Sequence, residues 1–352
     1  MKPPSIKDIA KALNISIGTV DRALHGRSDI SPATRERVLQ KAAQLGYEPN
    51  FAARALKLNR RVRIGVYFPR EIAFFFDSLR AGVRAAAAGS MAVNVELVFR
   101  DFPRLDQGDV ELLAADSEQR FDGVLIAPGN PTRIEPALRK LAQRGTAVIC
   151  VATDAPHSTR LAAVTADAHT SGAIAAELFS RTIHKTGPLA TITGDLRTLD
   201  HAEKLRGFAA NLAVHAPHLS LLPAFESHEQ PNVASKQAVA LLAKKPYPLG
   251  IYISTANSIS VLKALDERDM LSKIQVIATD LFPELVPYIE SGKILATLYQ
   301  RPYTQGKRAI ELLLNYILSG VAPPPLTRLA PHIILRSNVF LFTNYLVDSP
   351  IG

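Results

Sequence analysis

Residues 6–57 read IKDIAKALNISIGTVDRALHGRSDISPATRERVLQKAAQLGYEPNFAARALK and hold the most specific structural signal of the chain. Ser5, directly before this stretch, and Asp8, within it, have the spacing of a capping box. In a capping box two side chains accept hydrogen bonds from backbone N–H groups at the start of a helix. The apolar residues that follow recur at helical spacing; they are Ile6, Ile9, Ala10 and Leu13. This pattern predicts a two-turn helix that ends near Asn14.

Two further helices are predicted in the same segment. Ser16 can cap a helix over 17–24, and Pro32 after Ser31 is typical of a first helical position, where the missing N–H costs nothing. The third helix is expected to end at Gly46 and to bury an apolar stripe formed by Val38, Leu39, Ala42 and Leu45. Three short helices with so tight a first turn predict a helix-turn-helix bundle.

The positive charge of the chain is concentrated in the same region. The 352 residues carry a formal net charge of +9, and residues 1–61, with 12 Lys and Arg against 5 Asp and Glu, account for +7 of it. A basic segment beside a nearly neutral remainder favours contact with a polyanion, and nucleic acid is the leading candidate. Charge alone leaves open the alternative of a basic surface that is merely solvated.

Ordered motifs in this segment carry a resemblance to a known family. They are D-I-A at 8–10, S-x-x-T-V-x-R at 16–22, T-R-E-R-V at 34–38, L-G-Y-x-P-N at 45–50 and A-R-x-L at 53–56. With these motifs the segment resembles the DNA-binding head of the LacI (lactose repressor) family. The resemblance implies that the second helix enters the major groove of DNA and reads base edges with its first residues.

The motif match and the chemistry of the major groove nominate residues for base reading. Arg22 can donate to two guanine acceptors, Ile17 offers an apolar contact to a thymine methyl group, and Gly18 has no side chain. Readout is therefore expected to depend on Arg22 and His25. Asp21 stands where the family usually has a small hydroxyl residue, and it either accepts a hydrogen bond from cytosine or steadies Arg22.

Hydroxyl residues and a linker complete the predicted DNA contacts. Ser16, Thr19 and Thr34 are candidates for phosphate contacts that fix the register on DNA, although Ser16 also has the ordinary role of a helix cap. Residues 50–57 resemble the family's hinge, which is too short to be a stable helix alone. The family's hinge folds on DNA and pairs with its dimer mate in the minor groove.

Within the hinge, Leu56 matches the leucine that wedges between base steps and bends the duplex. An ordinary apolar linker residue is the alternative for this position. The resemblance implies further groove and backbone contacts for Asn50, Ala53 and Arg54.

From residue 62 onward, apolar strand-like runs alternate with amphipathic helical segments. Strands are predicted at 64–68, 93–99, 123–128, 147–152, 189–193, 220–225, 250–254, 275–279 and 294–299, with helices such as 74–88, 134–145, 171–184, 203–215 and 261–269 between them. This alternation predicts an α/β fold of parallel sheets flanked by helices. The body resembles the periplasmic-type sugar-binding proteins that are fused to heads of this family, which implies two lobes, crossing strands and a ligand cleft.

The resemblance also implies a domain organisation. We expect a helix-turn-helix domain over 1–49, a hinge and linker over 50–61, an N-lobe over 62–166 with 302–328, and a C-lobe over 167–301 with 329–352.

Matches to family motifs nominate residues for the cleft, beginning in the expected N-lobe. Phe74, Phe75 and Phe76 follow the first strand, and each can either stack on a ligand or pack into the core of the lobe. Asp154 ends the fourth strand, at the rim where α/β sheets bind ligands. Ala152 stands where the family often has another carboxylate, which weakens the interpretation as a simple sugar site.

The expected C-lobe supplies the other cleft candidates. Lys204 stands where a ligand-binding arginine is common, and this substitution loses bidentate geometry. Asp280 ends the strand over 275–279, Ser254 and Asn257 lie near a usual amide position, and Gln300 lies where the chain is expected to cross between lobes.

Several classes of protein are disfavoured. A hydrophobic content of 47% is incompatible with a disordered chain, and no apolar run has the roughly 20 residues of a membrane span. No motif of a phosphate-binding loop, a zinc protease, a serine hydrolase or a dinucleotide fold occurs. Cys150 is the only cysteine, which excludes intramolecular disulfides and cysteine-cluster metal sites. We therefore expect no enzymatic activity, no cofactor and no metal.

The sequence thus predicts a cytoplasmic, dimeric transcription regulator, most simply a repressor, that binds a pseudo-palindromic operator. The expected effector is a sugar, polyol or sugar phosphate in the interlobe cleft, with the sign of its coupling to DNA left open. A ligand-responsive activator of the same architecture is the main alternative. A non-regulatory sugar-binding protein or a transport receptor is opposed by the basic head, and no signal peptide is expected from the N-terminal residues.

Overall fold

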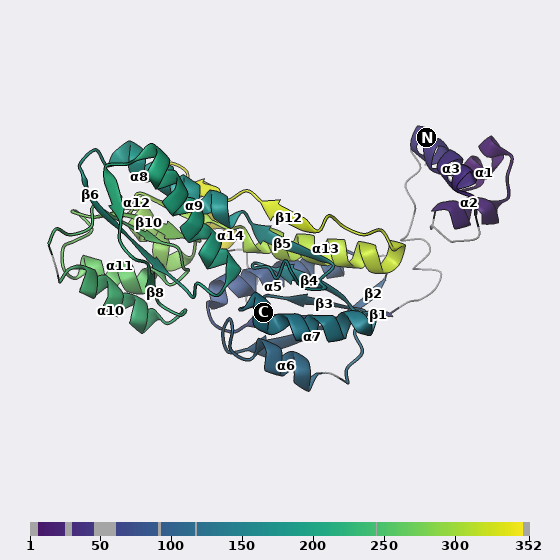
Figure 1. Ribbon diagram of the computed structural model, residues 1–352, viewed down its shortest axis with the longest axis horizontal. Coiled ribbons are helices and arrows are strands. Elements are labelled where there is room, and N and C mark those ends of the chain that lie inside the picture. The colour runs from purple at the N-terminus through teal and green to yellow at the C-terminus, as the bar shows by residue number, and fades with distance from the viewer. Residues whose placement is uncertain are drawn as a thin grey trace. The chain divides into compact units, whose positions relative to one another are not determined.

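The structure of the protein is a computed structural model that describes residues 6–24, 30–45, 61–90, 93–116, 118–243 and 245–347. It divides into two compact units, of which the first comprises residues 1–61 with the segments 90–94 and 314–322. The remainder forms the second unit (Figure 1). Each unit has a hydrophobic core of its own. A search of these ranges for a helix long and apolar enough to cross a membrane finds none.

In the first unit three helices pack around a small core, as predicted. They are α1 (Ile6–Leu13), α2 (Ile17–Leu24) and α3 (Pro32–Gln44). The Oγ atom of Ser16 accepts a hydrogen bond of 3.0 Å from the backbone N–H of Thr19, so the expected cap of α2 is present. The core consists of Ile9, Ala10, Val20, Ala23, Val38 and Ala42.

The predicted buried stripe of α3 is wrong at two positions. Val38 and Ala42 are buried, whereas Leu39 is 45% exposed and Leu45 is 38% exposed. Residues four apart share one face of a helix, but Leu39 lies about 100° around the axis from Val38. Two short partner helices cover only one face of α3, and both leucines therefore remain accessible.

In the second unit, a six-stranded sheet forms what we call the first lobe. Its strand order is β12-β5-β4-β3-β1-β2, and the pairs β1–β3, β3–β4, β4–β5 and β5–β12 are all parallel. The strands are β1 (Arg61–Pro69), β2 (Asn94–Phe102), β3 (Gly123–Ile126), β4 (Ala147–Val151), β5 (Ala162–Ala166) and β12 (Leu326–Leu329). The helices of this lobe are α5 (Ala73–Ala88), α6 (Asp109–Ala115), α7 (Pro131–Gln143) and α13 (Pro302–Ser319).

A seven-stranded sheet forms the second lobe. Its order is β13-β11-β10-β9-β6-β7, with β8 paired to β6 and only β13 antiparallel to its neighbour. The strands are β6 (Gly187–Thr193), β7 (Leu219–Leu221), β8 (Phe225–Glu226), β9 (Gly250–Ile253), β10 (Gln275–Thr279), β11 (Ala296–Tyr299) and β13 (His332–Ile334). The helices are α8 (Ala168–Thr182), α9 (Leu199–His215), α10 (Pro231–Leu241), α11 (Ser258–Asp266), the 3-10 turn Pro283–Leu285, α12 (Val286–Glu290) and α14 (Phe340–Val347).

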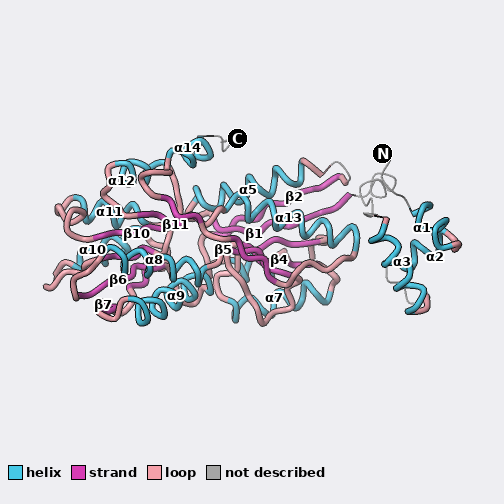
Figure 2. Tube along the Cα trace, turned by 90° about the horizontal axis from the view of Figure 1, so that it is seen from above, coloured by secondary structure: helices cyan, strands magenta, loops and turns pink. Residues whose placement is uncertain are grey.

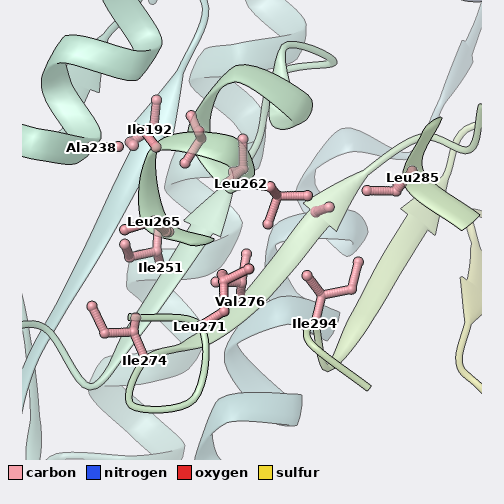
Figure 3. Close-up of a cluster of buried hydrophobic side chains, with 14 of the residues drawn as sticks. Ile192, Ala238, Ile251, Leu262, Leu265, Leu271, Ile274, Val276, Leu285 and Ile294 are labelled. Carbon is pink, nitrogen blue, oxygen red and sulfur yellow. The ribbon is translucent and has the colours of Figure 1, made fainter. Parts of the chain in front are cut away.

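The interior of each sheet carries the apolar runs that predicted its strands. In the second lobe, Ile192, Ile251 and Val276 extend from neighbouring strands toward Leu262 and Leu265 of α11 (Figure 3). These five side chains are almost completely buried. Apolar burial of this extent is the main favourable term that holds the sheet and its helices together.

The chain passes between the lobes three times. It leaves the first lobe after β5, returns to it after β11, and leaves it again after β12. The predicted α/β architecture of parallel sheets with helices is confirmed, whereas the domain boundaries given above remain a prediction.

One predicted strand, over residues 220–225, is instead two short strands, β7 and β8. Pro223 lies between them, and a proline has no N–H to donate to a sheet. The sequence reasoning also passed over β5, β12 and β13, which are three to five residues long, and the helices α6, α10, α13 and α14.

Helices α8 and α9 lie side by side on the second lobe (Figure 2). A Cβ atom on Gly172 of α8 would overlap the carbonyl oxygen of Lys204, and one on Gly207 of α9 would overlap that of His169. The absence of a side chain at both positions allows the two backbones to approach closely. This contact holds α9, and hence the side chains at its start, in place.

Candidate functional site

A pocket lies between the two lobes, at the carboxyl ends of β4, β9, β10 and β11. It contains about 440 Å³ of empty space, part of which is open to solvent. Its walls come from the first lobe through Ile72, Phe75, Phe76, Leu105, Ala152 and Thr153, and from the second lobe through Thr198, Asp200, His201, Lys204, Glu229, Ser254, Ala256, Asp280 and Gln300. Six of the nine predicted effector residues therefore line one pocket: Phe75, Phe76, Lys204, Ser254, Asp280 and Gln300.

Asp280 follows the last residue of β10 and is almost completely buried. Its two carboxylate oxygens accept hydrogen bonds from the backbone N–H of Gln300 at 3.2 Å and from the Nε2 amide of Gln300 at 2.8 Å. Burial raises the pKa of Asp280 to about 6, although the Lys204 ammonium and the bonds from Gln300 favour the charged form. Desolvation of a carboxylate is costly, so this group is a strong acceptor for any donor that enters the pocket.

The ammonium group of Lys204 is buried at the first turns of α9. Its Nζ atom donates to Asp200 Oδ2 at 2.6 Å and lies 3.5 Å from the carbonyl oxygen of Ser254. Asp200 Oδ1 and the Oγ atom of Ser254 are buried without a hydrogen-bond partner among the described residues. Unsatisfied buried polar atoms are rare, and these two lie on the pocket wall, where a ligand can satisfy them.

A third polar group pairs Glu229 with His201. The Nε2 atom of His201 lies 2.6 Å from Glu229 Oε1, and Thr255 Oγ1 donates to Glu229 Oε2 at 2.7 Å. Burial by itself would raise the pKa of Glu229, but His201, Thr255 and Lys204 outweigh it and hold the pKa below its ordinary value. Any side chain at Gly194, which follows β6, would overlap both Glu229 and His201. The glycine is therefore required for this pair.

The first lobe covers these polar groups with apolar side chains. Phe75 and Phe76 on the first turn of α5 are buried, and their rings meet edge to face with centroids 5.0 Å apart. Ile72 precedes this helix with a φ of 56°. A β-branched residue rarely adopts this left-handed conformation, and such strain is often found at binding sites.

Three predicted effector residues lie elsewhere. Phe74 packs on Phe282 of the second lobe, with ring centroids 4.0 Å apart. Asp154 is one residue beyond the pocket residue Thr153, and the Arg160 guanidinium contacts both of its carboxylate oxygens. Asn257 precedes α11 and donates from Nδ2 to Glu229 Oε2 at 2.9 Å, so it supports a pocket residue from outside.

The start of α2 is exposed in the helical unit. Ser16, Ile17 and Gly18 are exposed, while Thr19, Asp21, Arg22 and Thr34 are half-buried. Ser16 is engaged with Thr19, and Thr34 Oγ1 accepts a 2.8 Å hydrogen bond from Ser31. His25, Asn50, Ala53, Arg54 and Leu56 lie outside the described residues.

Comparison with known protein families decides the identity. Residues 5–50 match the family described as bacterial regulatory proteins, lacI family, and residues 64–320 match a periplasmic binding protein domain. The chain belongs to the LacI family of bacterial regulatory proteins. The resemblance stated from the sequence is thereby confirmed, and the protein is a LacI-family transcriptional regulator with a periplasmic-binding-protein-like body.

Two relatives of this LacI-family regulator match along nearly the whole chain, and a third relative matches about a third of it. Catabolite control protein A of Priestia megaterium is 24% identical over 346 residues, which is 95% of this chain and 98% of that protein. The HTH-type transcriptional repressor PurR of Aliivibrio fischeri (strain MJ11) is 26% identical over 350 residues, again 95% and 98%. The HTH-type transcriptional regulator RafR of Escherichia coli is 49% identical over 129 residues, 35% of this chain and 37% of that protein.

Solved structures match the body of the regulator. GanP, a glucose-galactose binding protein from Geobacillus stearothermophilus, is 25% identical with a TM-score of 0.71 and covers 80% of this chain and 99% of its own. A solute-binding protein from Burkholderia graminis, 23% identical, has a TM-score of 0.72 over 79% of this chain and 96% of its own. At 23% identity, the similarity to the Burkholderia graminis protein concerns the fold alone.

Sequence reasoning missed several pocket residues of the regulator. Asp200 stands four residues before Lys204, and His201 stands three residues before it at the start of the motif HAEKLRGF. Helical spacing alone places Asp200 beside Lys204. Glu229 gave no such signal, because it follows the two-residue strand β8 in a turn where His228 and Glu229 both have positive φ.

Proposed function

We propose that this LacI-family regulator is a repressor. In this proposal it binds a pseudo-palindromic operator as a homodimer in the cytoplasm and responds to a small polyhydroxylated effector in the pocket. The observation that carries the proposal is the pocket itself, which is lined by both lobes in a chain that also has a lacI-family head. The repressor named PurR among its relatives supports repression over activation.

The charge of the pocket supports a neutral sugar or polyol over a sugar phosphate in this position. Three carboxylates, Asp200, Glu229 and Asp280, line the pocket together with one ammonium, that of Lys204, and with His201, which is paired with Glu229. Carboxylates and the free acceptor atoms bind hydroxyl donors well, and they repel a phosphate group. GanP, whose name states glucose and galactose, supports the same class of ligand.

The residues predicted from the sequence have different roles in the body and in the head of this regulator. In the body, Phe75 and Phe76 form the apolar cover, while Lys204, Ser254, Asp280 and Gln300 bind ligand hydroxyl groups. In the head, base reading is assigned to Arg22 with Ile17, and the domain boundaries are those expected above. The relatives reported are regulators, and no enzymatic activity is proposed.

A direct test of the DNA-binding role is selection of operator sequences from a random duplex pool by the full-length protein. We expect a two-fold symmetric consensus. Arg22→Ala is expected to relax sequence preference by about 1–3 kcal/mol while salt-sensitive binding to any duplex remains. Equal preference for operator and scrambled duplex in both proteins would remove Arg22 from base reading.

A thermal-shift screen of sugars, polyols and sugar phosphates tests the effector. A ligand that binds the folded body raises its melting temperature, and at a given ligand concentration the shift grows with the logarithm of the affinity. We expect neutral sugars or polyols to give the largest shifts and to change operator affinity. Absence of any shift from these classes, or a shift with no effect on operator affinity, would contradict the proposal.

A further inference from the structure

A second, larger hollow adjoins the effector pocket. We call it the trough; it contains about 1340 Å³ of empty space, part of it open to solvent. Its walls are the connection from β4 to β5, the start of α8, the outward side of α9 and the strand β12. Ala152, Thr153 and Asp200 line both the trough and the pocket, so the two spaces share one wall.

The carboxylates of the trough are already engaged within the protein. Asp154 is paired with Arg160, Asp200 with Lys204, and Glu203 with Arg206. Asp167 caps α8 by accepting a 3.0 Å hydrogen bond from the backbone N–H of Thr170. Their negative charges are therefore largely neutralised by partners that the fold supplies.

The basic groups of the trough are less engaged. Among the described residues, the side chains of Arg328, His157 and His169 have neither an ion pair nor a hydrogen bond, although all three line the trough. Arg328 is exposed on β12, opposite Thr165 of β5 in the parallel register. A guanidinium group with no internal partner at the edge of a hollow is available to an anion that enters it.

Two further features point into the same space. The 15-residue helix α8 begins at Ala168, and the backbone N–H groups of its first turn lack acceptors within the helix. Asp167 already accepts from the N–H of Thr170, which leaves those of Ala168 and His169 for an anion. Thr153 is only 3% exposed, and its Oγ1 atom has no hydrogen-bond partner among the described residues. A buried hydroxyl group without a partner costs stability unless something satisfies it.

We propose that the trough is a second binding site that accepts a phosphoryl group. Arg328 and the start of α8 would hold the anion at one side, and Thr153 would hold it at the wall shared with the pocket. Arg328 is the arginine of the trough lining that has no acidic partner among the described residues, whereas the acids there are already engaged, so an anion is favoured beside Arg328. The group arrives either as free inorganic phosphate or on a ligand whose neutral part occupies the pocket.

Titration calorimetry of the full-length protein with inorganic phosphate at constant ionic strength tests the site. Arg328→Ala and His169→Gln remove exposed groups of the trough, and Arg181→Ala removes an arginine at the far end of α8 that is paired with Glu177. We expect the first two to weaken saturable phosphate binding by up to about fivefold, which is the upper size of one exposed charge contact. Arg181→Ala should match the unsubstituted protein.

The basic head is unsubstituted in all these variants, so any phosphate that it binds would be the same in each titration. Operator binding by each variant reports that the protein is folded, and the phosphate readout does not depend on whether the protein is a repressor. Phosphate affinity that is unchanged in both Arg328→Ala and His169→Gln, or an unsubstituted protein with no saturable phosphate binding, would overturn the proposal.

Glucose and glucose 6-phosphate as probes distinguish the two sources of the phosphoryl group. If a ligand spans both spaces, glucose 6-phosphate binds more tightly than glucose, and Arg328→Ala removes the difference. If free phosphate is the occupant, glucose 6-phosphate gains nothing over glucose, and inorganic phosphate binds equally with and without glucose.

Discussion

The two walls of the pocket differ sharply in chemistry. The first lobe contributes Ile72, Phe75, Phe76, Leu105 and Ala152, with Thr153 as its one polar side chain. The second lobe contributes nearly all the charged and hydrogen-bonding groups, among them Lys204, Glu229 and Asp280. We infer that the two lobes have different roles: the polar second lobe selects the ligand by its hydroxyl groups, and the apolar first lobe excludes water from the bound ligand.

Asp280→Ala is the strongest test of the polar wall. The variant removes a buried acceptor from the site, and we expect effector affinity to fall by about 2 kcal/mol or more, roughly 30-fold, with operator affinity unchanged. Isothermal titration with the effector found by the screen measures this. Asp266→Ala, which removes an acid that is paired with Lys293 on the same lobe, is the matched control. A variant that responds at the same effector concentration removes Asp280 from the site.

The protonation of Asp280 gives a prediction about pH. Its pKa rises from 3.8 to about 6 on folding, so the folded state binds the proton more tightly. The stability from this group is fully present below about pH 4 and is lost as pH rises through 6. Asp280→Asn is therefore expected to be more stable than the unsubstituted protein at pH 7.5, by at most about 3 kcal/mol.

Thermal unfolding at pH 4.5 and pH 7.5 checks this expectation, with the asparagine variant and the unsubstituted protein measured in parallel. The difference between them should shrink at the lower pH. A difference that is the same at both values would show that Asp280 does not carry the pH dependence.

Gly194→Ala tests the second polar pair. The added methyl group overlaps Glu229 and His201, and we expect a loss of about 2 kcal/mol in unfolding free energy together with weaker effector binding. Gly89→Ala is the control, because its Cβ meets its nearest neighbour at an ordinary 3.4 Å. Denaturant unfolding compares the two, and equal midpoints would argue against a tight fit at Gly194.

The apolar wall should give the smallest effect. Phe75→Leu keeps an apolar side chain of similar volume and removes only the ring, so we expect effector affinity to fall by about 1 kcal/mol, roughly fivefold. Phe99→Leu on β2 is outside the pocket and serves as control. A loss of effector affinity as large as that expected for Asp280→Ala would contradict the different roles proposed for the two pocket walls.

The polar wall was partly predictable because parallel strands end at one edge of a sheet. Asp280, Ser254 and Gln300 each follow a strand of the second lobe, so the strand predictions placed them together. The same rule led to Asp154, which lies one residue too far along the chain: Thr153 lines the pocket, and Arg160 engages Asp154. Beyond the end of a strand the alternation of side chains no longer applies, so the sequence pattern does not tell which of two successive residues faces the pocket.

Other features of the pocket depend on tertiary contacts, which cannot be inferred from a sequence pattern. The αL conformation of Ile72 and the paired left-handed residues at His228 and Glu229 are set by tertiary packing, since neither stretch contains a glycine. The fold of the body was more accessible, because apolar runs and helical spacing recur along it. Its shortest strands, such as β8, were too brief to produce a pattern.

Gln300 joins the pocket to the path of the chain between the lobes. Its side chain holds Asp280, while its carbonyl oxygen accepts a 2.8 Å hydrogen bond from Gln305 of α13 in the first lobe. The next residue, Arg301, has a φ of 60°. Because Gln300 lies where the chain returns to the first lobe, its two hydrogen bonds connect the carboxylate of Asp280 to α13 of that lobe. A displacement of α13 relative to β10 would therefore strain the hydrogen bonds that hold this carboxylate in the pocket wall.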